Sequence, residues 1–310
     1  MVGRTLRANV PARQRQRTPP AKPANRTRRQ ARQPTHNGPE APPHDPKRRP
    51  AARPVAAPQS LADSPRPRVS FVVPAYNEER LLPACLQAIR AEIGRTGCTA
   101  EVLVVNNAST DNTAAIALAE PGVTVVDQPI KGLVQARSAG FLASRGVLVA
   151  NIDADTLIPE GWLARVLYEF DRNPRLVCVS GPYDYHDVPI HIRAFTRGFY
   201  LMGYATYAFN KHVLGVGAMV QGGNFVLVRD VMEGIGGYSD AFTFYGEDTD
   251  IARRMSKVGD VVFTFKLTAK SSGRRLRGDG VVMTGIRYGA NYLWATFFRK
   301  PFTTAWNDYR

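Results

Sequence analysis

The stretch Val147-Leu148-Val149-Ala150-Asn151-Ile152-Asp153-Ala154-Asp155 joins a short apolar run to two carboxylates. A run of this length after Gly146 is typical of a buried strand. If strand geometry continues to the end, Asp153 and Asp155 point to the same side, because alternate side chains share a face. Two carboxylates on one side suit a divalent cation that also binds a diphosphate. A simple turn is the alternative interpretation.

Apolar runs and helical patterns alternate on both sides of this stretch. The other runs that predict strands lie at 69–73, 101–105, 123–126, 176–180 and 225–228. The segments with helix-like spacing of apolar residues are 82–93, 111–119, 132–144 and 163–170. This alternation predicts an α/β fold, in which parallel strands form a sheet buried on both faces. Ligands of such sheets bind at the carboxyl ends of the strands.

Polar residues follow three of the predicted strands. Pro-Ala-Tyr-Asn-Glu occupies 74–78, Asn-Asn-Ala-Ser-Thr-Asp-Asn-Thr occupies 106–113, and the carboxylate pair follows the central strand. Ser109 or Asp111 could serve as a helix N-cap. Caps alone do not account for three polar strand ends, so a polar ligand site is expected there. The glycine-rich fingerprints of dinucleotide and P-loop sites are absent from the sequence.

The basic charge of the chain is concentrated at its start. Residues 1–68 hold 16 of the 41 Lys and Arg residues and 3 of the 26 acidic residues, which leaves 25 basic and 23 acidic residues for the rest. This Pro- and Arg-rich segment has few large apolar residues, so disorder is expected. It could bind nucleic acid or an anionic membrane surface. A functionless extension, or a start codon assigned too early, is the alternative, and no secretory signal follows the first arginines.

The three cysteines, Cys85, Cys98 and Cys178, lack the spacing of paired metal ligands. Their odd number fits a reducing compartment, where buried structural thiols are the usual case. A cytoplasmic location is therefore expected, with peripheral attachment to the inner face of the membrane as an option.

Two later segments are apolar and aromatic. Segment 195–209 cannot span a bilayer, because only the 13 residues 198–210 are uncharged and about 20 are needed. This segment has two interpretations. It belongs to the ordinary core, or it forms a wall of the site on the side where a substrate that accepts a transferred group would bind. Segment 280–298 predicts an amphipathic helix flanked by arginines and aromatic residues. It fits either an interfacial membrane contact or a helix packed on the catalytic domain.

An acidic cluster, Gly246-Glu247-Asp248-Thr249-Asp250, opens a predicted helix. The helix dipole alone favours acidic residues there. One of them could also act as a base in the site. Because adjacent helical residues do not share a face, we expect only one of the neighbours Glu247 and Asp248 to reach it.

Taken in order, six motifs resemble those of family 2 glycosyltransferases with the GT-A fold. The motifs are residues 74–78, 106–113, 131–137, 153–155, 222–224 and 246–250, the last followed by Arg253 and Arg254. The resemblance implies a Rossmann-like, mostly parallel sheet flanked by helices. It divides the chain into a disordered tail (1–66), a GT-A domain (67–270) and a C-terminal amphipathic helix and tail (271–310).

The resemblance also implies an activity, which is the metal-dependent, inverting transfer of a hexose from a nucleotide-diphosphate sugar to an acceptor hydroxyl. Cell-surface polysaccharide or glycolipid synthesis is the expected setting, with an unknown saccharide or lipid-linked acceptor. The rival hypotheses are a nucleic-acid- or membrane-binding protein that acts through its tail, and a catalytically inactive nucleotide-sugar-binding module.

Residue roles follow from the same resemblance. Asp248 is the expected base, Asp155 holds Mn²⁺ or Mg²⁺, and Asp153 faces the metal, ribose or diphosphate. The residues expected to contact the donor or acceptor sugar are Gly223, Asn224 and Glu247. The residues expected to line the nucleotide pocket are Pro74, Tyr76, Glu78, Asn106 or Asn107, and Arg137.

Two features depart from common members of the family. Many members have an acidic residue where this chain has Asn106 and Asn107, which leaves the identity of the nucleotide base open. The Gln-x-x-Arg-Trp signature of processive synthases is missing after Asp248. Its absence favours single additions over polymerisation.

Overall fold

A computed structural model describes residues 65–213, 218–239, 241–242, 246–298 and 302–303. All of them belong to one compact unit, Ala52–Arg310. The expected disorder of the tail concerns residues 1–66, of which 1–64 lie outside the described residues. Arg66 forms a bidentate ion pair with Asp230 at 2.8 and 3.0 Å.

The described part of the chain contains a seven-stranded sheet with the order β3-β2-β1-β4-β8-β6-β9. All neighbouring strands are parallel except those that flank β8, which is antiparallel to both β4 and β6. The α/β fold class with a mostly parallel sheet is thus confirmed. The strands are β1 (Val69–Ala75), β2 (Ala100–Asn106), β3 (Val123–Asp127), β4 (Leu148–Ile152), β6 (Leu176–Ser180), β8 (Asn224–Val228) and β9 (Asp260–Phe263).

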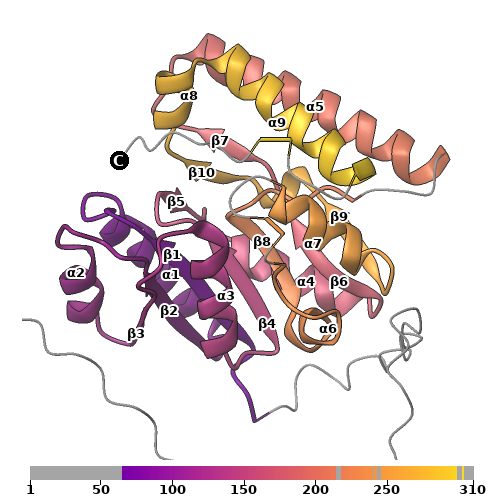
Figure 1. Cartoon of the computed structure of the whole chain (residues 1–310). Helices are drawn as coiled ribbons and strands as arrows, with labels where there is room; N and C mark the ends of the chain where they lie inside the picture. Colours follow the sequence, from indigo (N-terminus) through magenta and orange to yellow (C-terminus); the bar gives the residue numbers. More distant parts are fainter. Residues whose placement is uncertain (1–64, 214–217, 240, 243–245, 299–301, 304–310) are drawn as a thin grey trace, which may run out of the picture. The chain divides into compact units, whose positions relative to one another are not determined.

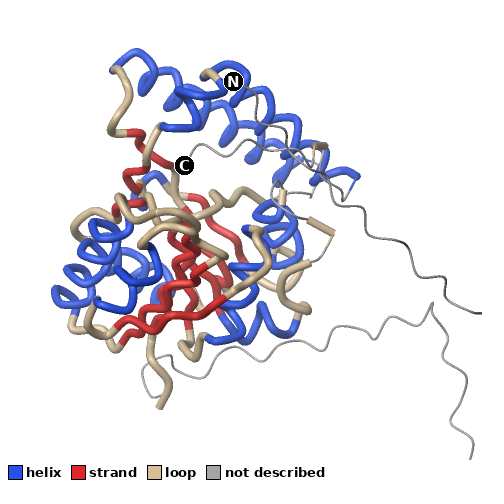
Figure 2. Tube along the Cα trace, turned by 60° about the vertical axis from the view of Figure 1, so that its left-hand side comes forward, coloured by secondary structure: helices blue, strands red, loops and turns tan. Residues whose placement is uncertain are grey.

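Helices flank this sheet, as Figures 1 and 2 show. Pro83 lies at the start of α1, where its missing N–H costs nothing, and Gly97 ends that helix in the left-handed conformation. The flanking helices are α1 (Leu82–Thr96), α2 (Thr113–Ala119), α3 (Leu133–Ala143), α4 (Trp162–Arg172), α6 (Arg229–Gly234) and α7 (Glu247–Met255).

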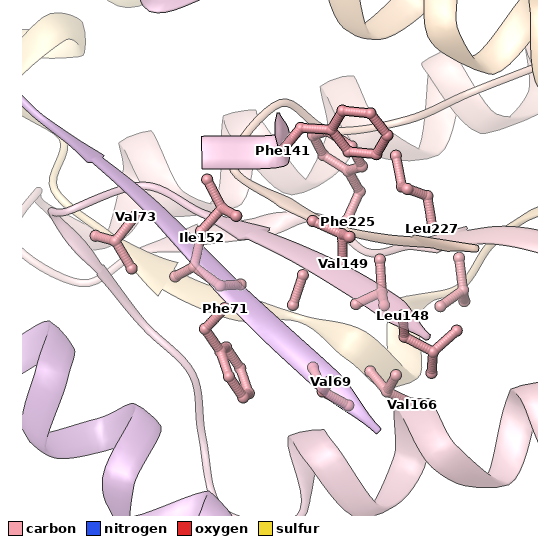
Figure 3. Close-up of a cluster of buried hydrophobic side chains, with 14 of the residues drawn as sticks. Val69, Phe71, Val73, Phe141, Leu148, Val149, Ile152, Val166, Phe225 and Leu227 are labelled. Atoms are coloured by element: carbon pink, nitrogen blue, oxygen red, sulfur yellow. The ribbon is translucent and has the colours of Figure 1, made fainter. Parts of the chain in front are cut away.

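The core surrounds β1 and β4. Phe71, Leu148 and Phe225 are fully buried, and Figure 3 shows Phe141 of α3 and Val166 of α4 on opposite sides of these strands. Burial on both faces explains why the strands read as continuous apolar runs in the sequence. This packing fixes the polar ends of β1, β2 and β4 next to one another.

A second layer lies beside the main sheet (Figure 1). It contains a small sheet with the order β5-β10-β7 and a helix, α9, that packs against α5, α7 and α8. None of the three strands of this small sheet is predicted from the sequence. The elements of this layer are β5 (Thr156–Leu157), β7 (Tyr183–Tyr185), α5 (Ile190–Val213), the 3₁₀ helix η1 (Phe265–Leu267), β10 (Ala269–Ser271), α8 (Arg274–Asp279) and α9 (Val281–Phe298).

Several local predictions can be compared with this fold. Segment 195–209 lies within the 24-residue helix α5, and segment 280–298 becomes α9. Cys85 and Cys178 are buried free thiols, as expected, whereas Cys98 is partly exposed. Within the described residues, none of the helices combines the length and apolarity needed to cross a bilayer.

Candidate functional site

A cavity of about 430 Å³ opens at the carboxyl ends of the central strands. Loops and helices from both layers line it, so residues distant in the sequence meet there. The lining includes seven residues expected at the site, namely Pro74, Glu78, Arg137, Asp153, Asp155, Glu247 and Asp248.

The two carboxylates after β4 lie in a turn. The strand ends at Ile152, and the Thr156 N–H donates to the Asp153 carbonyl at 2.9 Å. The turn interpretation of this triplet is therefore right for the backbone, and the expectation of continued strand geometry is wrong, because the chain reverses to form β5. Asp153 and Asp155 nevertheless both line the cavity.

Gly222 and Gly223 connect the carboxylates of two different motifs. The Gly222 N–H donates to Asp248 Oδ2 at 3.1 Å, and the Gly223 carbonyl accepts from the Asp153 N–H at 3.2 Å. Gly223 has φ of +80°, and a Cβ there would overlap the Asp153 carboxylate and the Tyr183 hydroxyl. Gly223 thus serves the site through its missing side chain, which leaves room for Asp153.

Arg137 is the buried cation of the site. Its guanidinium forms an ion pair with Glu247 and donates to Asp153 Oδ1 at 2.8 Å. Burial opposes the charge of Arg137, but Glu247 and Asp153 more than offset this effect, and they hold its pKa above the usual value. Arg137 therefore links the carboxylate after β4 to the acidic cluster of α7.

Glu247 is a buried carboxylate whose two oxygen atoms differ in their contacts. Its Oε1 pairs with Arg137, whereas its Oε2 is buried and has no hydrogen-bond partner. Burial raises the pKa of Glu247 to about 8, although Arg137 acts in the opposite direction. A buried polar atom without a partner costs about 1–3 kcal/mol. Such an atom at the wall of a cavity indicates a missing hydrogen-bond partner.

Asp248 lies in the first turn of α7. Its Oδ1 accepts from the Thr249 N–H at 2.7 Å, and burial raises its pKa. The expectation that only one of Glu247 and Asp248 would reach the site is wrong, since both side chains line the cavity. At the first turn the side chains surround the open end of the helix, so the rule for helix faces does not separate them.

Arg274 is a site residue that the sequence analysis missed. It lies at the start of α8, pairs with the buried Glu78, and donates to Asp155 Oδ2 at 3.1 Å. Glu78 and Asp155 hold the pKa of Arg274 above its usual value despite the opposing effect of burial. In the sequence Arg274 is one of several arginines around α9, and only its contacts distinguish it from the others.

The donor set fits a divalent cation that is shared with a substrate. Among the described residues there is no cluster of three or more His, Cys, Asp or Glu side chains that could hold a metal by itself. Asp153 and Asp155 supply carboxylate oxygens, and Mg²⁺ is often held by one or two carboxylates plus substrate phosphates. A cation here therefore depends on the diphosphate for its remaining ligands.

Three of the expected nucleotide-pocket residues are not among the residues that line the cavity. The Tyr76 ring lies under the Lys131 ammonium, 3.8 Å from the ring centre. Asn106 donates to Asp127 Oδ1 at 3.0 Å. Asn107 is buried, donates to the Ile130 carbonyl at 2.7 Å and accepts from the Gly132 N–H at 2.8 Å. The Asn107 amide thus holds the loop that leads into α3.

Asn224 has a structural role instead of the expected contact with a sugar. It is fully buried. Its Nδ2 donates to the carbonyls of Gly181 and Leu267 at 2.9 and 2.8 Å, and its Oδ1 accepts from Trp162 Nε1 at 3.1 Å. Because these bonds already use both polar atoms, its side chain cannot also bind a ligand in this arrangement.

The sequence of this chain is similar to those of known glycosyltransferases. A sequence model of the family described as Glycosyl transferase family 2 matches residues 70–236. An uncharacterised glycosyltransferase of Mycobacterium bovis is 42% identical over 109 residues, which cover 35% of this chain and 46% of the relative. A dolichyl-phosphate beta-glucosyltransferase of Trichomonas vaginalis is 38% identical over 107 residues, or 31% of this chain and 33% of the relative. The matches thus span less than half of the length of these relatives.

Solved structures agree on the fold. A mannosyltransferase from Pyrobaculum calidifontis in complex with GDP-Man and Mn²⁺ has a TM-score of 0.54 and 22% identity, covering 70% of this chain and 63% of that one. Glucosyl-3-phosphoglycerate synthase from Mycobacterium tuberculosis, in complex with Mn²⁺ and UDP-glucose, has a TM-score of 0.52 and 19% identity. It covers 74% of this chain and 78% of that one. At this level of identity the likeness concerns the fold.

Proposed function

Because the chain belongs to glycosyl transferase family 2, we propose that it transfers a hexose from a nucleotide-diphosphate sugar to an acceptor hydroxyl. The transfer inverts the anomeric carbon. The catalytic domain is residues 67–270, and residues 271–310 add a helix that contributes to the same cavity.

One observation carries this proposal. Three carboxylates from two motifs, namely Asp153, Asp155 and Asp248, line a single cavity together with the buried Arg137. The catalytically inactive alternative leaves Asp248 without a task, and its raised pKa suits a group that takes up a proton.

Asp155, with Asp153 beside it, is the proposed holder of Mn²⁺ or Mg²⁺. When bound, the cation acts as a Lewis acid on the diphosphate, an effect worth several kcal/mol. Arg137 and Arg274, which donate to Asp153 and Asp155, add positive charge beside these carboxylates. This arrangement stabilises the negative charge that grows on the departing nucleoside diphosphate. The solved neighbours that contain Mn²⁺ and a nucleotide sugar support this assignment.

Asp248 is the proposed general base. It takes the proton of the acceptor hydroxyl as that oxygen attacks the anomeric carbon from the side opposite the diphosphate. General-base assistance typically contributes about 10²- to 10⁴-fold. The Gly222 and Thr249 N–H groups fix the carboxylate in position. Glu247 is proposed to form a hydrogen bond with a hydroxyl of the sugar through its unpartnered oxygen.

Pro74 and Glu78 at the end of β1 are proposed to form the nucleotide side of the cavity. Tyr76 and the amides of Asn106 and Asn107 support the neighbouring loops. The names of several relatives indicate work on polysaccharides or lipid-linked sugars, such as the succinoglycan biosynthesis protein of Rhizobium meliloti. We place this chain in cell-surface polysaccharide or glycolipid synthesis, at the cytoplasmic side of the membrane.

Calorimetric titration of UDP and GDP, with and without Mn²⁺, tests the proposal. We expect one nucleotide to bind to the wild type only with Mn²⁺, and Asp155→Ala to lose that dependence. The matched control is Asp171→Ala, which changes a surface carboxylate paired with Arg68 outside the cavity. If neither nucleotide binds, or if binding ignores both metal and Asp155, the assignment of the carboxylate pair is wrong.

Slow hydrolysis of the matching nucleotide sugar separates the enzyme from an inactive binding module. A transferase that lacks its acceptor is expected to release free sugar slowly. Asp155→Ala should release less free sugar than the wild type. Nucleotide binding without any such release, and without transfer to any acceptor, favours the inactive module.

A further inference from the structure

Helices α5 and α9 expose apolar side chains where a surface helix normally carries charged ones. Residues 198–209 of α5 contain no charged residue. The inward positions Tyr200 and Tyr207 are buried, whereas Leu201 is 59% exposed. On α9 the outward Ile286 is 61% exposed. The apolar surface of this helix pair is therefore not used by the described core.

These outward residues form what we call the α5–α9 apolar face. The two helices pack together and lie side by side in Figure 1. Large exposed apolar side chains gathered on neighbouring helices mark an interaction site. The residues of the face are Leu201, Met202, Phe209, Val282, Met283, Ile286, Leu293, Trp294 and Phe298.

The two segments that carry this face are net basic. Segment 190–213 contains three Lys and Arg residues and no acidic residue, and segment 274–298 contains four arginines and one aspartate. Arg197 and Arg277 pair with Asp184 and Asp187, and their side chains stay about half exposed or more. An apolar helix face flanked by an excess of basic residues is complementary to an anionic lipid surface.

The cavity connects this face with the carboxylates. It is lined by Asp155 and Asp248, and also by Gly203, Gly285 and Leu293 of the two helices. Most of the side chains that α5 and α9 contribute to the lining are aromatic or aliphatic, with a few threonines and one asparagine among them. A predominantly apolar lining of this kind suits a hydrocarbon chain.

We propose that the α5–α9 apolar face docks on an anionic lipid bilayer, and that the acceptor is lipid-borne, with its apolar chain in the cavity between α5 and α9. The acceptor part of the proposal rests on the proposed function. The bond between the anomeric carbon and the donor phosphate oxygen breaks, and the acceptor oxygen forms the new bond. The acceptor proton passes to Asp248, and the nucleoside diphosphate leaves.

Vesicle flotation of the full chain tests the docking. The vesicles contain phosphatidylcholine alone or with 30% phosphatidylglycerol. We expect the wild type to float with the anionic vesicles and the double variant Leu201→Glu/Ile286→Glu to lose at least about tenfold in binding. The matched control is Leu118→Glu/Leu142→Glu, which alters leucines of α2 and α3 that are 70% and 73% exposed. This control should float like the wild type.

The chain-binding cavity is tested with farnesyl phosphate, an anionic amphiphile, as the calorimetric probe. A leucine at Gly203 places its side chain in the cavity, where the first added atom would lie 3.5 Å from Met219 Cε. We expect Gly203→Leu to weaken farnesyl phosphate binding at least about tenfold. Gly198→Leu is the control, because a Cβ at Gly198 meets nothing within 4 Å and Gly198 does not line the cavity.

The outcomes separate this proposal from the function itself. Equal flotation of the wild type and Leu201→Glu/Ile286→Glu, or no flotation of the wild type, overturns the docking. A wild-type dimer that the double variant converts to a monomer, without flotation, assigns the face to a second copy and also overturns it. Equal farnesyl phosphate binding by Gly203→Leu overturns the lipid-borne acceptor. Metal-dependent nucleotide binding by the same variants leaves the transferase assignment standing in each case.

Discussion

Gly223 shows how much of the site depends on one missing side chain. A Cβ at this position would occupy the space of the Asp153 carboxylate, and its left-handed φ adds strain of about 1–2 kcal/mol for any other residue. We predict that Gly223→Ala abolishes Mn²⁺-dependent nucleotide binding, as measured by calorimetry.

Gly161→Ala is the matched control for this variant. Gly161 has φ of +81°, but a Cβ there meets nothing within 4 Å. It should lose stability through the same backbone strain and still bind nucleotide. Normal binding by Gly223→Ala would show that Asp153 does not need its present position.

Glu247 makes the stability of the protein depend on pH. Burial raises its pKa in the folded protein to about 8, from the ordinary value of 4.5. Between these two values the unfolded chain releases a proton that the folded protein keeps. Folding stability therefore falls as the pH rises through this window. We predict that Glu247→Gln removes this part of the decline, so that its unfolding free energy relative to the wild type improves from pH 5 to pH 8.

Urea unfolding at the two pH values measures the effect, and Glu233→Gln, at an exposed glutamate of α6, is the control. Only the change between the two pH values is used, because the substitution also alters the contact with Arg137. A wild type and Glu247→Gln that respond equally to pH would contradict a raised pKa at this site.

At the scale of elements, α8 brings a cation to the carboxylates that end β1 and β4. Arg274 pairs with Glu78 and Asp155, and so it neutralises the same oxygens that a metal ion would use. We predict that Arg274→Gln binds Mn²⁺ alone more tightly, by about fivefold, the upper range for a partly exposed ion pair. Electron paramagnetic resonance of free Mn²⁺ measures this affinity.

Arg277→Gln is the control, because Arg277 lies on the same helix and pairs with Asp187 at 3.1 Å. An unchanged or weaker Mn²⁺ affinity in Arg274→Gln would mean that Arg274 and the metal do not compete. Titration with the nucleotide in addition to Mn²⁺ then shows whether Arg274 also contributes to holding the diphosphate.

At the scale of the whole molecule, the hydrophobic core begins at Val69. The segment before it contains few large apolar residues. We predict that deletion of residues 1–64, which keeps the Arg66–Asp230 pair, changes neither the thermal midpoint nor the nucleotide affinity. Differential scanning calorimetry and nucleotide titration check this, with the full chain as reference. A large decrease in the thermal midpoint or in the nucleotide affinity would show that the tail contributes to folding or to the site.

The same deletion tests the basic tail as a binding segment. If the tail alone carries nucleic-acid binding, salt-dependent retention on DNA should disappear with it, whereas flotation on anionic vesicles through α5 and α9 should persist. Loss of flotation in the truncated chain would instead assign the membrane contact to the tail.

The α/β fold and the main candidates for the site follow from the amino-acid sequence alone. Periodicity is local, so the runs at 69–73 and 176–180 could be recognised as strands. The polar residues at their ends follow from the geometry of parallel sheets. The motifs around Asp153, Gly222 and Glu247 lie in elements that one sheet places together.

Tertiary structure decided the rest, because it depends on contacts between residues far apart in the chain. Arg274 lies 196 positions from Glu78, and nothing in its local sequence indicates that pairing. The Asn224 amide forms its structural hydrogen bonds only when the elements are packed. The burial that raises the pKa of Glu247 also exists only in the packed protein. The local sequence shows which residues can carry a charge. The contacts and the low-dielectric surroundings of the folded protein decide which of these residues form ion pairs and which carboxyl groups stay protonated.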